Sequence, residues 1–507
     1  MRRDISTLDV FNRVIDEHLP ARDLWPERVY RLPALQYPDT LNLADRLLDH
    51  ARVDPGKTAI VTRSDRMSYH DLRLRVLSLA GGLLRVGIRP ADRVALRLPN
   101  GPDFIAAWLA VQWVGAIGVQ LSPLYRRREI ERVANHSGAS VIVCASDSLG
   151  SVEAARAAID ARIVSLDDLA GDPIPSPAHP NHRDQPALIT YITSADGPLK
   201  GVVHSPADIL ASVDTYARDV IRLTSADVCI GTVSLAWAFG LGALMTFPLR
   251  AGATSTLVDG PVELLGAVAA SRATILFGVP TMYRTLLRHP DLGSADLRSL
   301  RCCVSAAEPL PADVAEQWRA RTGLEILDGL GTTELTHVFI SARPGAVRPG
   351  LVGTPVAGYE ARIVDENFHE LPDGVLGQLA VRGPTGALYW RDADAQRRAV
   401  RHGWTLTGDL CVRHADGWFQ HLRRTDALIV SAGYKISIRE VEDALIAHPG
   451  VSAARVFAVP DPVRGAVAAA VVTPAPHADA STLVERLQQY LKAELAPFKC
   501  PRAIRIQ

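Results

Sequence analysis

The sequence predicts an α/β protein with a large N-terminal body, built from two βαβ-type sheets and a small β-barrel, and a small α+β unit at the C-terminus. Between residues 40 and 260, short apolar runs alternate with helical patterns, which is typical of parallel sheets covered by helices. Beyond Gly350 the pattern changes to short alternating strands with glycine turns. Near Asp426 a further mixture of helices and strands begins, and it predicts a separate C-terminal unit.

Individual elements follow from the spacing of apolar residues and from helix-ending residues. Residues 93–98 and 140–144 read as strands and residues 103–114 as a helix, and Gly138 ends the helix before the second strand. A proline-dense stretch, residues 171–186, should be a surface connection with solvated His179 and His182. The remaining predicted elements are strands at 359–364 and 377–381, a helix at 441–448, strands at 453–459 and 466–472, and a helix at 481–495.

Composition excludes several functional classes. The chain has 507 residues, room for about three structural units of roughly 150 residues each. Lys+Arg and Asp+Glu both total 55, so the formal net charge is zero and no overall field attracts nucleic acid or an anionic membrane. We expect neither as a partner. The basic run 126–128 leads into a mixed-charge segment and is typical of a solvated helix start.

The cysteines and the N-terminus indicate a reduced, cytoplasmic protein. The six cysteines form no Cys-x-x-Cys pair, so structural zinc is not expected, and adjacent Cys302 and Cys303 should point to opposite faces of a strand. The first residues lack the apolar core of a secretory signal. No apolar run reaches the roughly 18 residues that a membrane helix needs.

The most informative stretch is residues 328–341, in which Gly331-Thr332-Thr333-Glu334 follows an apolar strand. Glycines let the backbone approach a ligand closely. A threonine hydroxyl can bond a phosphate oxygen, and a carboxylate is the hard oxygen ligand that Mg²⁺ prefers. The pattern therefore predicts a site for a nucleotide, its phosphate and its metal. The alternative is a tight glycine turn that only joins two strands.

Four blocks stand in a characteristic order along the chain. Residues 193–201 come first, then 331–334, then 407–410, and last Arg424-Thr-Asp426 with Gly433-Tyr-Lys435. In this order the chain resembles the adenylate-forming superfamily of acyl-CoA synthetases, nonribosomal adenylation domains and luciferases, from about Leu41 to its last residue. Within the superfamily it is most similar to benzoate- and 2-aminobenzoate-CoA ligases, through the N-terminal segment 32–38 and through His337 after the second block.

The resemblance implies an ATP-using ligase that needs Mg²⁺. In such enzymes a carboxylate attacks the α-phosphate of ATP, and the acyl-adenylate is opened by a nucleophile, usually the thiol of coenzyme A. Glu334 would ligate Mg²⁺, Thr333 would bond the α-phosphate, and Lys200 would complete the catalytic set. Asp409 would accept both ribose hydroxyls. The implied nucleotide-binding residues are Thr193, Ser194, Ala307, Glu308, Asp328, Gly329, Gly331, Thr333, Asp409 and Arg424.

The resemblance also implies a moving C-terminal domain. Asp426 matches the hinge about which this domain rotates between the two half-reactions. The chain is therefore expected to consist of an N-terminal domain, residues 1–422, and a small mobile C-terminal domain, residues 423–507. The alternatives to these functional roles are a strand-end turn at 407–409 and plain surface charge at 424–426.

An aromatic pocket is implied by a further set of residues. Phe239 matches an aromatic wall and Gly240 a glycine floor beside an aryl ring, and an apolar slot with few polar groups suits a small planar ring. Phe239 and Val338 could instead be core residues, and His337 a structural histidine. The implied pocket consists of Ala238, Phe239, Gly240, Ala306, Gly331, His337 and Val338.

The chain departs from the family pattern in several places. The phosphate loop is one residue shorter and carries Ala195, Asp196 and Leu199, and Asp196 brings a negative charge toward a polyphosphate. The sequence ends at Gln507, before a Gly-Lys pair whose lysine bonds the acid and the phosphate in the family. A truncated chain, a natural shortening, and chemistry that does not need this lysine are all consistent with that end. Further replacements are Arg423, Ala427 and, for a glycine, Ala307; Lys435 and Lys499 match no such role.

The predicted function is activation of a small aromatic acid, a benzoate or aminobenzoate, as its acyl-adenylate with transfer to coenzyme A. Two alternatives stay open. One is a diazotase of secondary metabolism that uses ATP to activate nitrite for coupling to an aromatic amine. The other is a non-catalytic relative that binds a nucleotide or an aryl ligand. The sequence does not choose between a monomer and a homodimer.

Overall fold

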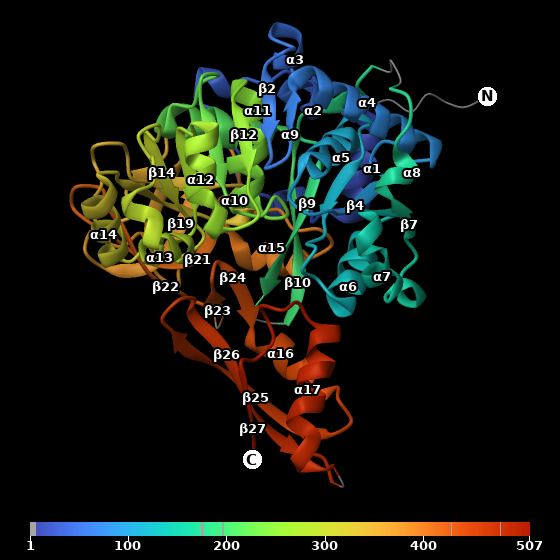
Figure 1. Ribbon diagram of the computed structural model, residues 1–507, viewed down its shortest axis with the longest axis vertical. Coiled ribbons are helices and arrows are strands. Elements are labelled where there is room, and N and C mark those ends of the chain that lie inside the picture. The colour runs from blue at the N-terminus through green and yellow to red at the C-terminus, as the bar shows by residue number, and fades with distance from the viewer. Residues whose placement is uncertain (1–6, 174–176, 195–196, 427, 477) are drawn as a thin grey trace.

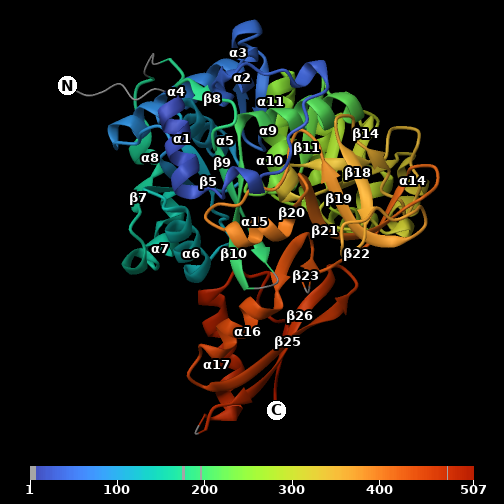
Figure 2. The same ribbon diagram turned by 180° about the vertical axis from the view of Figure 1, so that it is seen from behind.

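The computed structural model describes residues 7–173, 177–194, 197–426, 428–476 and 478–507. Figures 1 and 2 show a large body and, below it, a smaller lobe formed by the C-terminal part of the chain. This mixed α/β architecture confirms the predicted fold class. Among the described residues, no helix has both the length and the apolar character to cross a membrane.

The first sheet of the body has six strands in the order β10-β9-β5-β4-β6-β7. All neighbours pair in parallel except β10, which returns antiparallel beside β9. The predicted strands and helix are confirmed, because β4, α5 and β6 lie within one or two residues of the predicted ranges. The bounds are β4 (Arg93–Arg97), α5 (Pro102–Trp113), β5 (Ile117–Gln120), α6 (Arg127–Ser137), β6 (Val141–Cys144), β7 (Arg162–Ser165), β9 (Leu188–Ser194) and β10 (Gly197–His204).

The second sheet has nine strands in the order β17-β16-β15-β14-β13-β11-β12-β2-β3. The six strands from β15 to β2 are parallel and the outer strands are antiparallel. Because neighbouring parallel strands end at the same edge, β14 and β15 bring Ser305 and Asp328 side by side. The bounds are β2 (Thr58–Val61), β3 (Arg66–Ser68), β11 (Val228–Gly231), β12 (Thr254–Leu257), β13 (Ile275–Gly278), β14 (Cys302–Ser305), β15 (Ile326–Gly331), β16 (Val338–Ser341) and β17 (Thr354–Pro355).

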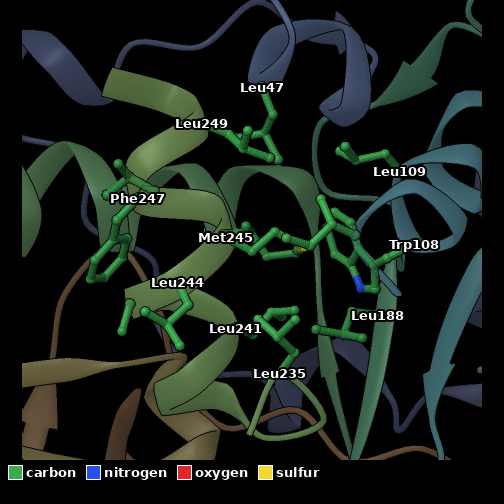
Figure 3. Packing of buried hydrophobic residues seen from close by; sticks show 14 of the residues in the cluster. Leu47, Trp108, Leu109, Leu188, Leu235, Leu241, Leu244, Met245, Phe247 and Leu249 are labelled. Atoms are coloured by element: carbon green, nitrogen blue, oxygen red, sulfur yellow. The ribbon is translucent and has the colours of Figure 1, made fainter. Parts of the chain in front are cut away.

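The main core joins the two sheets through a helical segment that begins with α10 (Ala238–Leu241) and ends with α11 (Phe247–Ala251). Figure 3 shows Met245 and Leu249 of this segment facing Trp108 and Leu109 of α5. Trp108 and Met245 are completely buried. The helix that carries the predicted pocket residues Ala238 to Gly240 is therefore anchored by the largest apolar cluster of the body.

The third sheet and the C-terminal lobe follow the predicted change of pattern. Strands β18 to β22 form an antiparallel half-barrel, the predicted small barrel. The lobe has five strands in the order β24-β23-β26-β25, with β27 beside β26, and its two helices lie within a few residues of their predicted ranges. The bounds are β18 (Glu360–Val364), β19 (Leu376–Arg382), β20 (Val400–Arg401), β21 (Trp404–Arg413), β22 (Phe419–Arg424), β23 (Leu428–Ser431), β24 (Tyr434–Ser437), α16 (Ile438–Ile446), β25 (Val451–Asp461), β26 (Gly465–Pro474), α17 (Ala480–Glu494) and β27 (Ala503–Ile506).

Two surface predictions are wrong. His179 is half-buried and its backbone N–H donates to Trp113 O at 2.8 Å, while His182 belongs to the short strand β8 (Asn181–His182). The proline-dense connection is therefore partly held in the body by backbone hydrogen bonds. The basic run does begin a helix, α6, but Arg127 is paired with Glu494 of the C-terminal lobe at 2.7 Å and is not simply solvated.

Candidate active site

The turn between β15 and β16 carries the Gly-x-Thr-Glu block. A Cβ at Gly331 would lie 2.6 Å from His337 O, so only glycine fits there. Glu334 lies in the short 3₁₀ helix η8 (Thr333–Leu335) and accepts a hydrogen bond of 3.0 Å from Tyr389 Oη. The buried Thr332 hydroxyl has no hydrogen-bond partner among the described residues. The alternative of a turn between two strands is correct as local structure, and this turn also presents a half-buried carboxylate.

Asp409 and Arg424 meet on neighbouring strands of the half-barrel. Asp409 Oδ1 accepts hydrogen bonds of 3.1 Å from both Arg424 Nη1 and His421 Nε2, and its buried Oδ2 has no partner in the described parts of the chain. Burial alone would raise the pKa of Asp409, but the hydrogen bond from His421 and the charge of Arg424 hold it below its usual value. Arg424 also forms two bonds of 2.8 Å to Asp426. An ionised Asp409 thus keeps one oxygen free for a donor.

Two half-buried carboxyl groups lie near each other's strands: Asp328 is within β15, and Glu308 follows β14 by three residues. Burial raises the pKa of Asp328 to about 8, although the Gly329 N–H donates to its Oδ1. Burial also raises the pKa of Glu308 to about 7, against the opposing hydrogen bond from Thr281. Ala307, immediately before Glu308, has a φ of +71°, the left-handed region that favours glycine. The loop therefore keeps a glycine conformation with an alanine in it.

The phosphate-loop residues lie on the hairpin of β9 and β10. Thr193 and Ser194 end β9, and Lys200 is on β10, opposite Ile192. Ala195 and Asp196 fall outside the described residues. Strand β10 packs against η8, so the hairpin approaches the helix that carries Thr333 and Glu334. The first two sequence blocks are thereby adjacent in space.

The predicted pocket residues surround a buried histidine. His337 Nε2 donates to Phe239 O at 3.2 Å, and the His337 ring packs at 5.3 Å from Phe239 and 4.5 Å from Phe247. A Cβ at Gly242 would lie 2.4 Å from His337 Cδ2, so a glycine is needed there to admit the ring. Phe239 is half-buried, whereas Ala306 and Val338 belong to the main core. The predicted pocket is thus a lining at the edge of the core.

Sequence reasoning assigned no role to several residues that complete this region. Lys435 on β24 is close enough to the site for the charges of Arg424, Glu334, Asp409 and Asp426 to act on it, and burial together with Arg424 lowers its pKa. A Cβ at Gly433 would lie 3.5 Å from Glu308 Oε1. The β23–β24 hairpin therefore faces the site, whereas the last residue lies at the far tip of the lobe in Figure 1. Tyr389, His421 and Thr281 lie outside the four blocks, and no local pattern signals them.

Glu334 is the carboxylate of the site that suits a magnesium ion. Within the described ranges, no group of three or more His, Cys, Asp or Glu residues could hold a metal ion by itself. Mg²⁺ in nucleotide sites usually takes one or two carboxylates, substrate phosphates and waters. One half-buried carboxylate beside the unpartnered Thr332 hydroxyl fits that kind of site.

Comparisons with known proteins agree on the protein family to which the chain is similar. The family described as AMP-binding enzyme matches residues 47–390, and the AMP-binding enzyme C-terminal domain matches residues 440–507. The chain is 32% identical to benzoate–CoA ligase of Thauera aromatica over 493 residues, which is 93% of each chain.

Two solved structures have the same architecture. The anthranilate CoA ligase AuaEII in complex with anthranoyl-AMP is 29% identical, covers 94% of this chain and 95% of its own, and gives a TM-score of 0.76. The amide bond synthetase McbA of Marinactinospora thermotolerans is 28% identical, covers 92% of this chain and 96% of its own, and gives a TM-score of 0.84. With its site at the edge of β14 and β15 and its C-terminal hairpin above that edge, this chain belongs to the AMP-binding enzymes of the adenylate-forming superfamily, an AMP-forming ligase family.

Proposed function

We propose that this protein uses ATP to convert a small aromatic carboxylic acid, a benzoate or aminobenzoate, into its acyl-adenylate and then transfers the acyl group to coenzyme A. The observation that carries the proposal is that the charges of Glu334 and Asp409 act on Lys435, while His337, three residues after Glu334, packs against Phe239. Anion-binding and carboxylate groups thus adjoin an apolar slot that suits a ring.

The nucleotide would lie across the edge of β14 and β15. The unpartnered Asp409 Oδ2 is the acceptor for a ribose hydroxyl, and Arg424 holds Asp409 in place. Asp328 and Glu308 offer carboxyl oxygens to the adenine amine. Thr193, Ser194 and Lys200 would face the phosphates from the β9–β10 hairpin, with Thr333 at the α-phosphate. The Ala307 loop and the glycines Gly329 and Gly331 would let the backbone approach the base.

Glu334 would hold Mg²⁺ through the carboxylate that Tyr389 orients. When bound, the ion supplies positive charge against the phosphates. The other roles belong to residues of the chain. They bring the acid carboxylate to the α-phosphate, from which pyrophosphate leaves, and they keep water away from the acyl-adenylate.

The C-terminal lobe would serve the second half-reaction in the observed arrangement. The β23–β24 hairpin sets Gly433 beside Glu308 and Lys435 near Glu334. A thiol that reaches the acyl carbon there would form the thioester, and AMP would leave with the bonding electron pair. Rotation about Asp426, between the domains 1–422 and 423–507, would present another face of the lobe during adenylation.

A mass-spectrometric assay tests the proposal. The protein is incubated with ATP, Mg²⁺ and a panel of benzoates and aminobenzoates, with and without coenzyme A. We expect pyrophosphate and an aryl-adenylate without coenzyme A, and AMP with an aryl-CoA in its presence. A protein that binds ATP but forms neither product from any acid of the panel would refute the proposed activity.

A second candidate function changes the nucleophile to an amine. The observation in its favour is that an amide bond synthetase, McbA, is among the similar solved structures, with 28% identity over 92% of this chain. The same assay with added amines would then give an amide and AMP. An arm with nitrite and an aromatic amine tests the diazotase alternative, whose product is a diazonium or diazo compound.

A further inference from the structure

A small cavity lies at the predicted aromatic pocket, since Ala238 and His337 help to line it. Its volume is about 10 Å³, which is room for the centre of about one water-sized group. Most of its wall is apolar, and it includes Leu188 and Leu241, whose side chains are close together in Figure 3. Two histidines, His204 and His337, also line it, together with the hydroxyl-bearing residues Ser212, Thr246 and Thr336. A cavity of this size accepts a single heavy atom attached to a ring, not a ring itself.

His337 contributes an unsatisfied acceptor. Phe239 O can only accept, so the hydrogen bond at 3.2 Å requires the proton on His337 Nε2. Burial lowers the pKa of His337 to about 3, so the ring is neutral near pH 7 and Nδ1 carries a lone pair. Nδ1 is buried, and none of the described residues donates a hydrogen bond to it. It can therefore accept a hydrogen bond from a ligand.

His204 contributes a second unpartnered ring nitrogen. Its Nδ1 lies 3.2 Å from Thr336 Oγ1, and its buried Nε2 has no hydrogen bond of good geometry among the described residues, although the Thr333 backbone acts on the pKa of the ring. Burial, reinforced by the charge of Arg28, lowers the pKa of His204 to about 3, so this ring is neutral too. The two side chains are 1% and 4% exposed. Unpaired buried polar groups are destabilising, so two of them on one cavity indicate a ligand group that completes both.

We propose that His204 and His337 form a subsite that reads one substituent of the aromatic acid and selects an amino or hydroxyl group. This inference rests on the proposed function. Either group is a single heavy atom that donates a hydrogen bond, and a hydroxyl also accepts one. A methyl group has a similar size but leaves both nitrogens unpaired. A second carboxylate is excluded, because the cavity offers no cation and burial of an unpaired charge is unfavourable.

Equilibrium binding tests the subsite without requiring turnover. Calorimetry compares aminobenzoates and hydroxybenzoates with the methylbenzoates of the same ring positions, in the presence of ATP and Mg²⁺. At one ring position the parent protein should bind the aminobenzoate or hydroxybenzoate at least about 10-fold more tightly than the methylbenzoate. The methyl group cannot form a hydrogen bond with the histidines and leaves them unpaired. His204→Phe and His337→Phe should each reduce this ratio toward one.

Tyr216→Phe is the matched control, because Tyr216 packs 5.5 Å from His337 but does not line the cavity. It should keep the parent ratio. ATP binding and melting temperature check that each histidine variant folds, and His204→Asn, which restores a polar group, provides a second variant should His204→Phe not fold. Equal binding of methylbenzoates and aminobenzoates by the parent protein would overturn the subsite. Histidine variants that keep the parent binding ratio would also overturn it, because the two histidines would then hold only a water molecule. If the protein binds the aminobenzoate or hydroxybenzoate more tightly than the methylbenzoate but forms no adenylate, the subsite is supported and only the proposed function is contradicted.

Discussion

The ammonium group of Lys499 lies 3.0 Å from the carboxylate of Glu129, and both side chains are fully buried. Lys499 also donates to Glu440 at 2.7 Å. Burial would lower the pKa of Lys499, but the charges of Glu129 and Glu440 raise it above its usual value, so the lysine stays ionised. Glu129 is on α6 of the body and Lys499 on the C-terminal lobe. This pair, with Arg127, Arg128 and Glu494 beside it, joins the lobe to the body.

Glu129→Gln should weaken the attachment of the lobe. The substitution keeps the shape but leaves the buried ammonium with one counter-charge, and breaking a buried pair costs about 3–5 kcal/mol. Differential scanning calorimetry should show a lower melting temperature, and limited proteolysis near Asp426 should be faster. Glu131→Gln is the control, because Glu131 pairs with Arg127 on the same helix and does not contact the lobe. Identical melting and proteolysis of the Glu129 variant and its parent would contradict the attachment.

Ala307→Gly should stabilise the protein by about 1 kcal/mol. A non-glycine residue with positive φ destabilises the folded state by about 1–3 kcal/mol. Glycine is more flexible in the unfolded chain, which lowers the gain in the free energy of unfolding by about 0.4–1 kcal/mol. The Ala307 side chain is exposed, so no cavity forms. Thermal melting measures the gain. Ala306→Gly, one position earlier in the buried core and without positive φ, should lower the melting temperature instead.

Asp409→Asn should weaken ATP binding by about 10- to 100-fold. A hydrogen bond to a charged group contributes about 1.5–3 kcal/mol, and the substitution removes the charge that Arg424 and His421 hold in place. Isothermal calorimetry with ATP gives the dissociation constant. An unchanged constant in a protein with parental melting temperature would exclude Asp409 as the ribose acceptor.

Glu334→Gln should abolish adenylate formation while leaving metal-free ATP binding unchanged. The amide keeps the hydrogen bond from Tyr389 but lacks the charge that Mg²⁺ requires. Acid-dependent release of pyrophosphate measures the loss, and Tyr389→Phe, which keeps the carboxylate, should lose far less activity. Release at the parent rate by the Gln variant would show that Glu334 is not the metal ligand.

Stability should fall in mild acid because of the two buried histidines. The pKa of His204 and of His337 is about 3 in the folded protein and about 6.5 in the unfolded chain. Below pH 6.5 the unfolded chain therefore binds protons that the folded protein does not. Each histidine lowers the free energy of unfolding by about 1.4 kcal/mol per pH unit until about pH 3. His204→Phe should show a smaller drop in melting temperature between pH 7.5 and 5.5 than the parent, and an equal drop would mean that His204 takes up its proton in the folded state.

Much of the fold could be predicted because local pattern determines it. The alternation of apolar runs and helices predicted α5, β4 and β6, and the change of pattern after Gly350 predicted the half-barrel. The site blocks were also visible, because a nucleotide site needs particular residue types at short spacing, such as Gly331 to Glu334. Their order along the chain carried the family, since four short blocks seldom recur together by chance.

The tertiary structure decided what the charged and polar residues contact. The run 126–128 looked solvated because its partner Glu494 lies 367 positions later in the sequence. No periodic pattern in the sequence predicts an ion pair between such distant residues. Likewise the sequence singled out His337 but not His204, and only packing places both on the wall of one cavity. The sequence by itself determined elements and family, because these depend on neighbours along the chain; burial, counter-ions and cavities depend on segments that only packing brings together.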